Sequence, residues 1–307
     1  PNAFQRTYGF LVKLDRLGQV LWTKKFEELN PGFSKMTQTR AYELNNGDII
    51  FTAQYTNDAT EKLWNTIVVR LSGGGGVLWQ NCLKSNMVVF NVPTGEMQFQ
   101  PESAVDGLNG DVILGGTSYG PLQGSRYGTA VRLNSTGQLV WDASYGRDLN
   151  STSAHELGAQ GVQVWMQNGQ LAFAVMNNGS ATSPVYNLSF LTLDYSNGQM
   201  VSAKYYRHEW LDFLEANKKR FTYGHYKFVP LTNGNFVFSG RINAEIYDLP
   251  LKEYFGIIEF DQNLNVRDAY TIASPVGNTN WEMSTMQFHP SGRGSIVLYQ
   301  YLGPNKA

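Results

Sequence analysis

The sequence has little cysteine, little charge and no long hydrophobic run. Cys82 is the only cysteine among 307 residues, so no disulfide can form within the chain, and we interpret this residue as a buried thiol on a strand. Charged residues make up 16% of the chain, against roughly 25% in typical globular proteins. The formal net charge is -1, which argues against broad electrostatic binding to nucleic acid or anionic membranes. No apolar segment approaches the roughly 18 residues that a spanning helix needs, so we expect no membrane insertion.

Glycine and aromatic residues are plentiful, and they occur in two phrases that recur along the chain. The 31 glycines and the aromatic content of 13% are typical of a β-rich protein with many tight turns. The first phrase, as in "NSTGQLVW", is anchored at Asp15, Ser72, Asn134, Asp194 and Asp261. The second, usually Asn-Gly before an apolar run, is anchored at Gly47, Gly110, Gly169, Gly234 and Gly292. Both recur about every 60 residues, which favours β-propeller blades over most helical repeats.

Each repeat unit is expected to form four strands. In 38–83 these are "TRAYEL", "DIIFTAQY", "TIVVRLS" and "GVLWQNCL". Asn46-Gly47 predicts a hairpin turn in which both central residues accept a positive φ. Runs such as "IIF" and "IVV" are typical of sheets that are covered on both faces. The same pattern predicts further four-stranded blades at 101–145, 160–206 and 226–270.

The two chain ends each supply half of a blade. Residues 8–26 read as a third and fourth strand, and residues 284–301 read as a first and second strand. Because open strand edges expose unpaired backbone groups, we expect the two halves to pair, with 294–301 antiparallel to 8–15. The predicted fold is therefore an all-β, five-bladed β-propeller of four-stranded antiparallel blades, a single domain over 1–307 closed by its two ends. The alternative is a fragment of a larger ring.

The unit "NGDVILGGTSYGPLQGSRYGTAVRLNSTGQLVWDASYG" (109–146) resembles the propeller repeat of secreted and surface proteins of Bacteroidetes and other bacteria. Residues 8–26 and 38–83 match that repeat as well, whereas Ser202 and Asp268 replace its tryptophan in the later units. The resemblance implies a propeller that is exported (extracellular, at the cell surface or periplasmic) and non-enzymatic. It brings no catalytic residues with it.

A weaker likeness to arylsulfotransferase-type propellers rests on "NGN" and on the G-x-V-x-W pattern. Those enzymes need a histidine nucleophile near the axis, and no histidine of this chain lies in a matching motif. The four histidines are His155, His208, His225 and His289.

Binding is expected on the face where the long loops meet. The tight turns join strands one to two and three to four, so the longer connections gather on the opposite face, where binding residues usually lie. Aromatic and arginine side chains are frequent anchors of interfaces and sugar sites, although each could equally pack beneath its own loop. The candidate binding residues are Trp64, Tyr119, Arg126, Arg147, Tyr186, Trp210, Tyr247 and Trp281.

The connection 205–226 departs from the repeat. The residues Trp210, Phe213, Leu214 and Asn217 recur at helical spacing. Glu215 stands four residues before Lys219, and together these features predict a short amphipathic helix. Two carboxylate pairs on the loops could act as acid and base on a glycoside, although loop carboxylates are usually only solvated. These pairs are Glu209 with Asp212, and Glu245 with Asp248.

The sequence predicts neither a cofactor nor a metal site. No set of metal ligands has a suitable spacing, and "SGGGG" (72–76) lacks the lysine and helix of a phosphate-binding loop. Four glycosylation sequons begin at Asn134, Asn150, Asn178 and Asn187, of which Asn150 and Asn178 are expected in loops.

Three functions remain open at this point. The absence of a recognisable catalytic motif favours a non-catalytic scaffold, with no enzymatic activity, that binds a protein partner or assembles with itself in an exported structure. The aromatic loops favour a carbohydrate-binding propeller. The third is a glycoside hydrolase or lyase with an axial site.

Overall fold

The structure, a computed structural model, describes residues 9–26, 35–56, 65–83, 98–119, 126–145, 158–178, 187–206, 219–221, 227–244, 253–273, 281–288 and 294–300. The chain divides into two compact units, each of which is described by itself: unit 1 comprises 1–181 and 189–204, and unit 2 comprises 182–188 and 205–307. Apart from a three-residue 3-10 helix (Leu108–Gly110), the regular structure of these ranges consists of β-strands, which confirms the all-β prediction.

The first complete sheet of unit 1 is a four-stranded antiparallel meander, as predicted for 38–83. Each strand pairs with the strand that follows it in the sequence, as expected for antiparallel strands that are joined by short connections. The strands are β3 (Lys35–Glu43), β4 (Ile49–Thr56), β5 (Asn65–Leu71) and β6 (Val77–Leu83).

Two further meanders follow in unit 1. One contains β7 (Gln98–Asp106), β8 (Val112–Tyr119), β9 (Arg126–Leu133) and β10 (Leu139–Tyr145). The other contains β11 (Gly158–Gln167), β12 (Gln170–Asn178), β13 (Asn187–Leu193) and β14 (Met200–Tyr206). A single parallel bridge, Gly158 to Arg126, joins the two meanders, so two blades are linked at that end of their strands.

The N-terminal residues of unit 1 form only the hairpin β1 (Gly9–Leu14) and β2 (Val20–Phe26), in agreement with the predicted half-blade. In unit 2, β20 (Trp281–Phe288) and β21 (Gly294–Gln300) form the other predicted hairpin. The pairing of 294–301 with 8–15 joins parts of the chain that are described separately, so it stays a prediction, as does the assignment of 1–307 to one domain.

Unit 2 also contains a sheet whose first strand is split. Its strands are β15 (Lys219–Phe221), β16 (Lys227–Pro230), β17 (Phe236–Ala244), β18 (Glu253–Phe260) and β19 (Val266–Ala273). β15 and β16 both pair with β17, at its two ends. The prediction of a helix within 205–226 is therefore wrong at 219–221, because these residues pair with the long strand β17. Residues 207–218 lie outside the described ranges.

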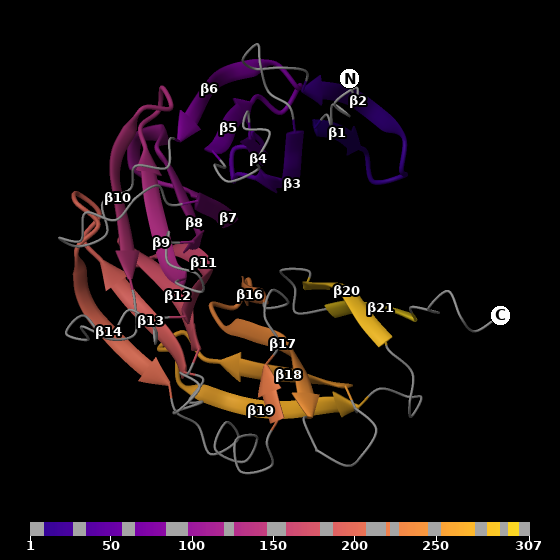
Figure 1. Cartoon of the computed structure of the whole chain (residues 1–307), viewed down its shortest axis with the longest axis vertical. Coiled ribbons are helices and arrows are strands. Elements are labelled where there is room, and N and C mark those ends of the chain that lie inside the picture. Colours follow the sequence, from indigo (N-terminus) through magenta and orange to yellow (C-terminus); the bar gives the residue numbers. More distant parts are fainter. Residues whose placement is uncertain are drawn as a thin grey trace, which may run out of the picture. The chain divides into compact units, whose positions relative to one another are not determined.

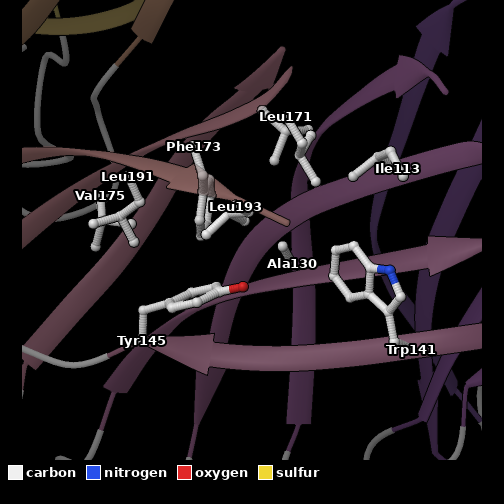
Figure 2. Packing of buried hydrophobic residues seen from close by; sticks show 10 residues of the cluster. Ile113, Ala130, Trp141, Tyr145, Leu171, Phe173, Val175, Leu191 and Leu193 are labelled. Carbon is white, nitrogen blue, oxygen red and sulfur yellow. The ribbon is translucent and has the colours of Figure 1, made fainter. Parts of the chain in front are cut away.

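Each central sheet of unit 1 is covered on both faces, because alternate residues of one strand enter different cores. On β8, Ile113 packs with Leu171 and Phe173 of the following sheet (Figure 2). Its neighbours Val112 and Leu114 pack instead with Ile50 and Val68 of the preceding sheet. This explains the continuous apolar runs of the sequence. Within unit 1 the first strands β3, β7 and β11 lie on the inner side and β6, β10 and β14 on the outer side (Figure 1).

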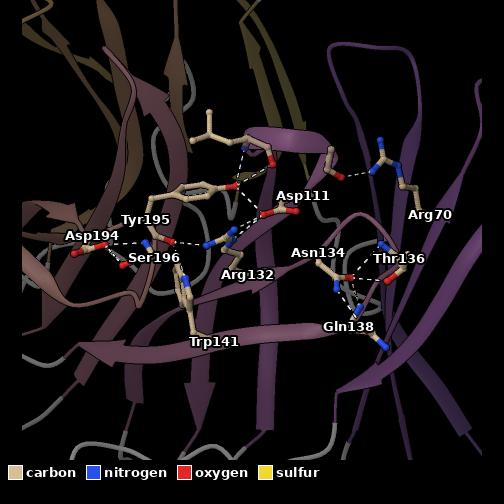
Figure 3. Close-up of polar contacts among 12 residues, drawn as sticks. Arg70, Asp111, Arg132, Asn134, Thr136, Gln138, Trp141, Asp194, Tyr195 and Ser196 are labelled. Carbon is tan, nitrogen blue, oxygen red and sulfur yellow. Dashed lines mark hydrogen bonds and ion pairs between the residues drawn. The ribbon is translucent and has the colours of Figure 1, made fainter.

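The first repeated phrase forms the turn between the third and fourth strands. The leading polar residue accepts backbone N–H groups with its side chain, which is why Asp, Asn or Ser stands there. Asn134 Oδ1, for example, accepts from the backbone N–H groups of Thr136 at 3.0 Å and Gln138 at 2.9 Å (Figure 3). In four of the five copies the turn ends on a glycine with positive φ: Gly18, Gly75, Gly137 and Gly198.

The second phrase forms two kinds of turn between the first and second strands. Asn168 and Gly169 make the predicted two-residue hairpin, with φ of 50° and 77°. At Asn46-Gly47 only the glycine has a positive φ, because the turn is longer: Leu44 N–H donates to the carbonyl of Asp48. The expectation that both residues at 46–47 have a positive φ is therefore wrong.

Tryptophans on the fourth strands pack against turn glycines of the next sheet in unit 1. Ring atoms of Trp22, Trp79 and Trp141 lie where a Cβ on the facing glycine would meet them, at 3.0, 2.5 and 2.7 Å. The glycines are Gly75, Gly137 and Gly198, respectively. Each ring thus lies on bare backbone, a close approach that only glycine allows.

Candidate functional site

The first strands of the sheets share an irregularity at corresponding positions. In unit 1 the register shifts between Thr37 and Arg40 on β3, between Pro101 and Ser103 on β7, and between Gly161 and Gln163 on β11. In unit 2, β20 carries a comparable shift between Met283 and Thr285. β-Bulges redirect side chains and are frequent next to active sites. The bulged part of the first strands is therefore the natural place to look for a site.

Glu102 is the extra residue of the β7 bulge, since Pro101 pairs with Gly116 and Ser103 with Gly115. Its Oε1 atom accepts hydrogen bonds from Arg40 Nη2 of the preceding sheet and from Gln100 Nε2, both at 2.9 Å. The side chains of Arg40 and Glu102 are 31% and 24% exposed, so the ion pair is partly accessible to solvent. A carboxylate and a guanidinium therefore meet between the first strands of two adjacent sheets.

Side chains of the preceding sheet also hold the backbone of β7. Tyr42 Oη donates to the carbonyl of Pro101 at 3.0 Å, and both Gln54 Nε2 and Thr66 Oγ1 donate to the carbonyl of Phe99. Burial raises the pKa of Tyr42 far above its ordinary value, so this phenol stays a neutral donor. These hydrogen bonds fix the position of β7, the strand that carries Glu102.

Backbone strain accompanies the bulge on β3. Gln38 has a φ of 49°, in the left-handed region that non-glycine residues rarely adopt. Such strain costs on the order of 1–3 kcal/mol and is concentrated at functional sites. Gln38 lies two residues before Arg40, on the same bulged stretch.

Tyr119 and Arg126 extend this group of polar side chains to the end of the β8–β9 hairpin, where the two residues pair across the strands. Tyr119 Oη donates to Gln100 Oε1 at 3.0 Å, which links it to the Glu102 carboxylate through Gln100. The Arg126 guanidinium lies over the Tyr119 ring, with Cζ at 5.3 Å from the ring centroid. Burial raises the pKa of Tyr119, and the charge of Arg126 opposes that rise. We call Arg40, Gln100, Glu102, Tyr119 and Arg126 the Glu102 cluster.

A second polar network lies at the opposite end of the same hairpin (Figure 3). Arg132 binds Asp111 Oδ2 at 2.7 Å, donates to the carbonyl of Tyr195 and lies over the Tyr195 ring. The hydroxyl of Tyr195 in turn donates to Asp111 Oδ2 at 3.0 Å and accepts from Leu108 N–H. This network joins tight turns of adjacent sheets, so we assign it a structural role.

The structure brings two of the eight predicted binding residues together, Tyr119 and Arg126. Trp281 is the first residue of β20, and its side chain is not described. The other five lie outside the described residues and stay predictions: Trp64, Arg147, Tyr186, Trp210 and Tyr247.

Sequence reasoning missed Arg40, Gln100 and Glu102. One signal was available, since Pro101 stands inside an otherwise good strand, and proline within a sheet marks an edge or a bulge. A charged residue directly after that proline, on an inner strand, indicates a side chain that the bulge turns away from the core. The bond between Arg40 and Glu102 joins different repeat units, so no local pattern could have revealed it.

The remaining candidates are placed as follows. The side chain of Asn134 is hydrogen-bonded within its turn, Asn178 ends β12 instead of lying in a loop, and Asn187 begins β13. Cys82 lies on β6, close to the hydroxyl of Tyr55. It is half-buried, whereas the sequence was interpreted as giving a buried thiol. The four histidines, Asn150 and the carboxylate pairs Glu209 with Asp212 and Glu245 with Asp248 lie outside the described residues.

Two further findings concern metals and membranes. Across the described ranges, no group of three or more His, Cys, Asp or Glu side chains is arranged to hold a metal ion. Within the same part of the chain, no helix has the length and apolar character that crossing a membrane requires.

Comparison with solved structures identifies the fold. The chain is similar to an α-L-arabinanase of Penicillium chrysogenum complexed with arabinobiose, with a TM-score of 0.50 and 10% identity over 78% of this chain and 66% of that one. It is also similar to two levansucrase variants of B. megaterium. One has a TM-score of 0.51 and 9% identity, over 87% of this chain and 78% of the other. The second has a TM-score of 0.50 and 10% identity, over 94% and 80%. No protein-family model and no curated protein sequence matches the chain.

These similarities confirm the propeller resemblance at the level of the fold, and the observed sheets fit five blades. They also correct two expectations. The non-catalytic scaffold and the absence of enzymatic activity were inferred from the lack of a catalytic motif, yet the proteins that share the fold are named as an arabinanase and levansucrases, both of which are enzymes. A site assembled from bulges on separate repeats would leave no motif in the sequence, so the lack of a motif does not exclude an enzyme.

Proposed function

We propose that the protein is a carbohydrate-active enzyme that cleaves or transfers glycosidic bonds at the Glu102 cluster. The observation that carries this proposal is the bulge on β7, which presents a carboxylate on an inner strand beside a guanidinium, an amide and a phenol. A few convergent polar groups on a rigid scaffold are what a site for a polar ligand requires. The similarity to an arabinanase and to levansucrases supports the class of substrate.

Chemistry gives Glu102 a specific role in this proposal. Cleavage of a glycosidic bond passes through a state with positive charge on the sugar ring and generally uses two carboxyl groups, one as proton donor and one as base or nucleophile. Glu102 is bound through Oε1 by Arg40 and Gln100, so its orientation is fixed by two donors. We assign to Glu102 the role of the carboxylate that faces the positively charged sugar ring.

The proposal assigns a role to Glu102 alone, and the carboxylate pairs Glu209 with Asp212 and Glu245 with Asp248 stay predictions from the sequence. A protein that acts on glycans outside the cell would be exported, in keeping with the repeat resemblance, and export is therefore part of this proposal.

The test compares the wild-type protein with Glu102→Gln on a panel of neutral and acidic oligosaccharides, with release of reducing ends as the readout. The glutamine keeps the size of the side chain and an acceptor oxygen but removes the negative charge. We expect cleavage to fall by about 10²-fold to 10⁴-fold, the usual contribution of a catalytic carboxyl group. Glu43→Gln is the matched control: Glu43 ends the same first strand β3 that carries Arg40 and is exposed in an ion pair with Lys13.

Three results separate the alternatives. Equal cleavage by wild type and Glu102→Gln would show that the site lies elsewhere. Binding of an oligosaccharide without cleavage would identify a carbohydrate-binding propeller, for which the ring and guanidinium of Tyr119 and Arg126 are the supporting contacts. Neither cleavage nor binding of any member of the panel would contradict the proposal.

A further inference from the structure

A buried serine hydroxyl directly follows the bulge residue Glu102. Ser103 is 2% exposed and pairs with Gly115 of β8. Its Oγ atom accepts the backbone N–H of Val164, on β11 of the next sheet, at 3.0 Å, and donates to the carbonyl of Gly115 at 3.4 Å. Val164 is itself fully buried. One hydroxyl group therefore connects three strands, β7, β8 and β11, next to the residue that carries the proposed chemistry.

Glycines at this contact show how closely the two sheets approach each other. A Cβ on Gly115 would meet Cγ1 of Val164 at 2.5 Å, and a Cβ on Gly161 would meet the carbonyl of Gly116. Only residues without a side chain allow so close an approach. The bulge of β11 lies between Gly161 and Gln163, directly before Val164. The bulges of β7 and β11 are therefore held against each other.

Glu102 is anchored through the residues on both sides of it. The preceding sheet holds the residue before it, because Tyr42 Oη donates to the carbonyl of Pro101 at 3.0 Å. The following sheet holds the residue after it, through the bond between Val164 and Ser103. A bulge redirects a side chain by its backbone conformation. The two anchors thus set the direction in which the side chain of Glu102 leaves the strand.

We infer that Ser103 is a positioning residue for the reaction assigned to Glu102. This inference rests on the proposed function and adds a residue to it. Because Ser103 is buried, it acts through the strand and not by contact with a sugar. Without the hydroxyl, the buried N–H of Val164 loses its acceptor, and the strands shift to satisfy it in another way. A shift of about 1 Å in a reacting group can reduce a rate by about 10²-fold.

The test measures steady-state cleavage by the full-length protein, with the oligosaccharide of the panel that the wild type cleaves fastest. We expect kcat of Ser103→Ala to fall by about tenfold to 10²-fold. KM should stay within about threefold of the wild-type value, because the lost interaction matters in the transition state and not in substrate binding.

Ser144→Ala is the matched control. Ser144 lies on β10 of the same meander, is 4% exposed and is hydrogen-bonded to the hydroxyl of Thr129 at 2.8 Å. Both variants remove the hydroxyl of a buried serine, so both should melt a few degrees lower than the wild type. Only Ser103→Ala should lower kcat beyond about threefold. An equal loss of kcat in the two variants would reduce the role of Ser103 to general stability and overturn the inference.

Two further measurements show whether Ser103 acts through Glu102. In the Glu102→Gln background, adding Ser103→Ala should lower kcat by less than about threefold, because residues that act as one unit are not additive. The full loss of both single variants, multiplied, would contradict this. Amide hydrogen exchange of Val164 should be faster in Ser103→Ala and unchanged in Ser144→Ala. Unchanged exchange in Ser103→Ala would equally count against the proposed anchor.

If Ser103→Ala does not fold, Ser103→Cys replaces it, because the thiol nearly keeps the size of the side chain but bonds only weakly. Its kcat should then fall by about fivefold or more, and a smaller loss would overturn the inference. Loss of cleavage in Glu102→Gln with wild-type kcat in Ser103→Ala would remove the positioning role and preserve the proposed function. Equal cleavage by the wild type and Glu102→Gln would instead remove the proposed function itself.

Discussion

The fourth strands of the sheets differ at one position of the repeat, which is tryptophan in three strands and serine or aspartate in two. One of the turns between the third and fourth strands differs as well. β2, β6 and β10 carry Trp22, Trp79 and Trp141, each of which lies on a turn glycine of the next sheet within unit 1. β14 and β19 carry Ser202 and Asp268 at the same place in the repeat. The turn that begins at Asp261 has Leu264 where the other described copies have glycine.

This difference separates two roles of the glycine. Leu264 has a φ of 61°, and its turn keeps the same hydrogen bonds, with Asp261 Oδ1 accepting from the N–H groups of Asn263 and Asn265 at 2.8 Å. The hydrogen bonds of the turn therefore tolerate a side chain, at the cost of strain. Gly18 and Gly47 have similar positive φ values, and no atom of the described residues lies within 4 Å of a Cβ built on them, so in this part of the chain they serve the backbone conformation alone. At Gly137 and Gly198 the tryptophan ring adds the requirement for space.

The largest effect is expected from Trp141→Ala. Trp141 is 8% exposed, belongs to the core between two sheets of unit 1 (Figure 2) and donates Nε1–H to the carbonyl of Tyr195 at 2.9 Å. We expect the free energy of unfolding to fall by about 3–5 kcal/mol, as for other buried tryptophans. Urea denaturation followed by circular dichroism measures it. Trp22→Ala, at a less buried copy of the contact, should cost less, and an equal or larger loss there would break the comparison.

An intermediate effect is expected from Gly137→Ala, with Gly47→Ala as its matched control. Both positions have a φ near +83°, so both variants suffer the strain of a left-handed residue, on the order of 1–2 kcal/mol. At Gly137 the new methyl group also meets the Trp79 ring at 2.5 Å, and overpacking adds about 1–3 kcal/mol. Melting of the two variants should show a clearly larger loss for Gly137→Ala. Equal losses would mean that the glycine serves only the turn.

The smallest effect, and the only stabilising one, is expected from Leu264→Gly. Glycine adopts the positive φ without strain, a gain of about 1–2 kcal/mol that the flexibility of glycine in the unfolded chain offsets by roughly 0.5–1 kcal/mol. The net gain in the free energy of unfolding should therefore be at most about 1.5 kcal/mol, measured by urea denaturation. Leu264→Ala keeps a Cβ and should show no gain; if it stabilises as much as glycine, the strain argument fails.

The repeats made most of the fold predictable, because hydrophobic alternation and turn residues act over short distances. The strands of 38–83 and 101–145 agree with the sequence pattern to within a few residues. Errors arose where tertiary context decides: β15 pairs with the far end of β17, and the Asn46-Gly47 turn is longer than the dipeptide suggests. The ion pair of Arg40 and Glu102 was out of reach for the same reason, since it joins residues of two repeats.

A structure of the Glu102→Gln variant, crystallised with the oligosaccharide that the wild type cleaves fastest, tests the central claim most directly. The account predicts that the sugar lies on the first strands of unit 1, with its anomeric carbon about 3–3.5 Å from the side chain at position 102, the separation of reacting groups. A sugar bound only to other parts of the chain, with the Glu102 cluster unchanged, would contradict it.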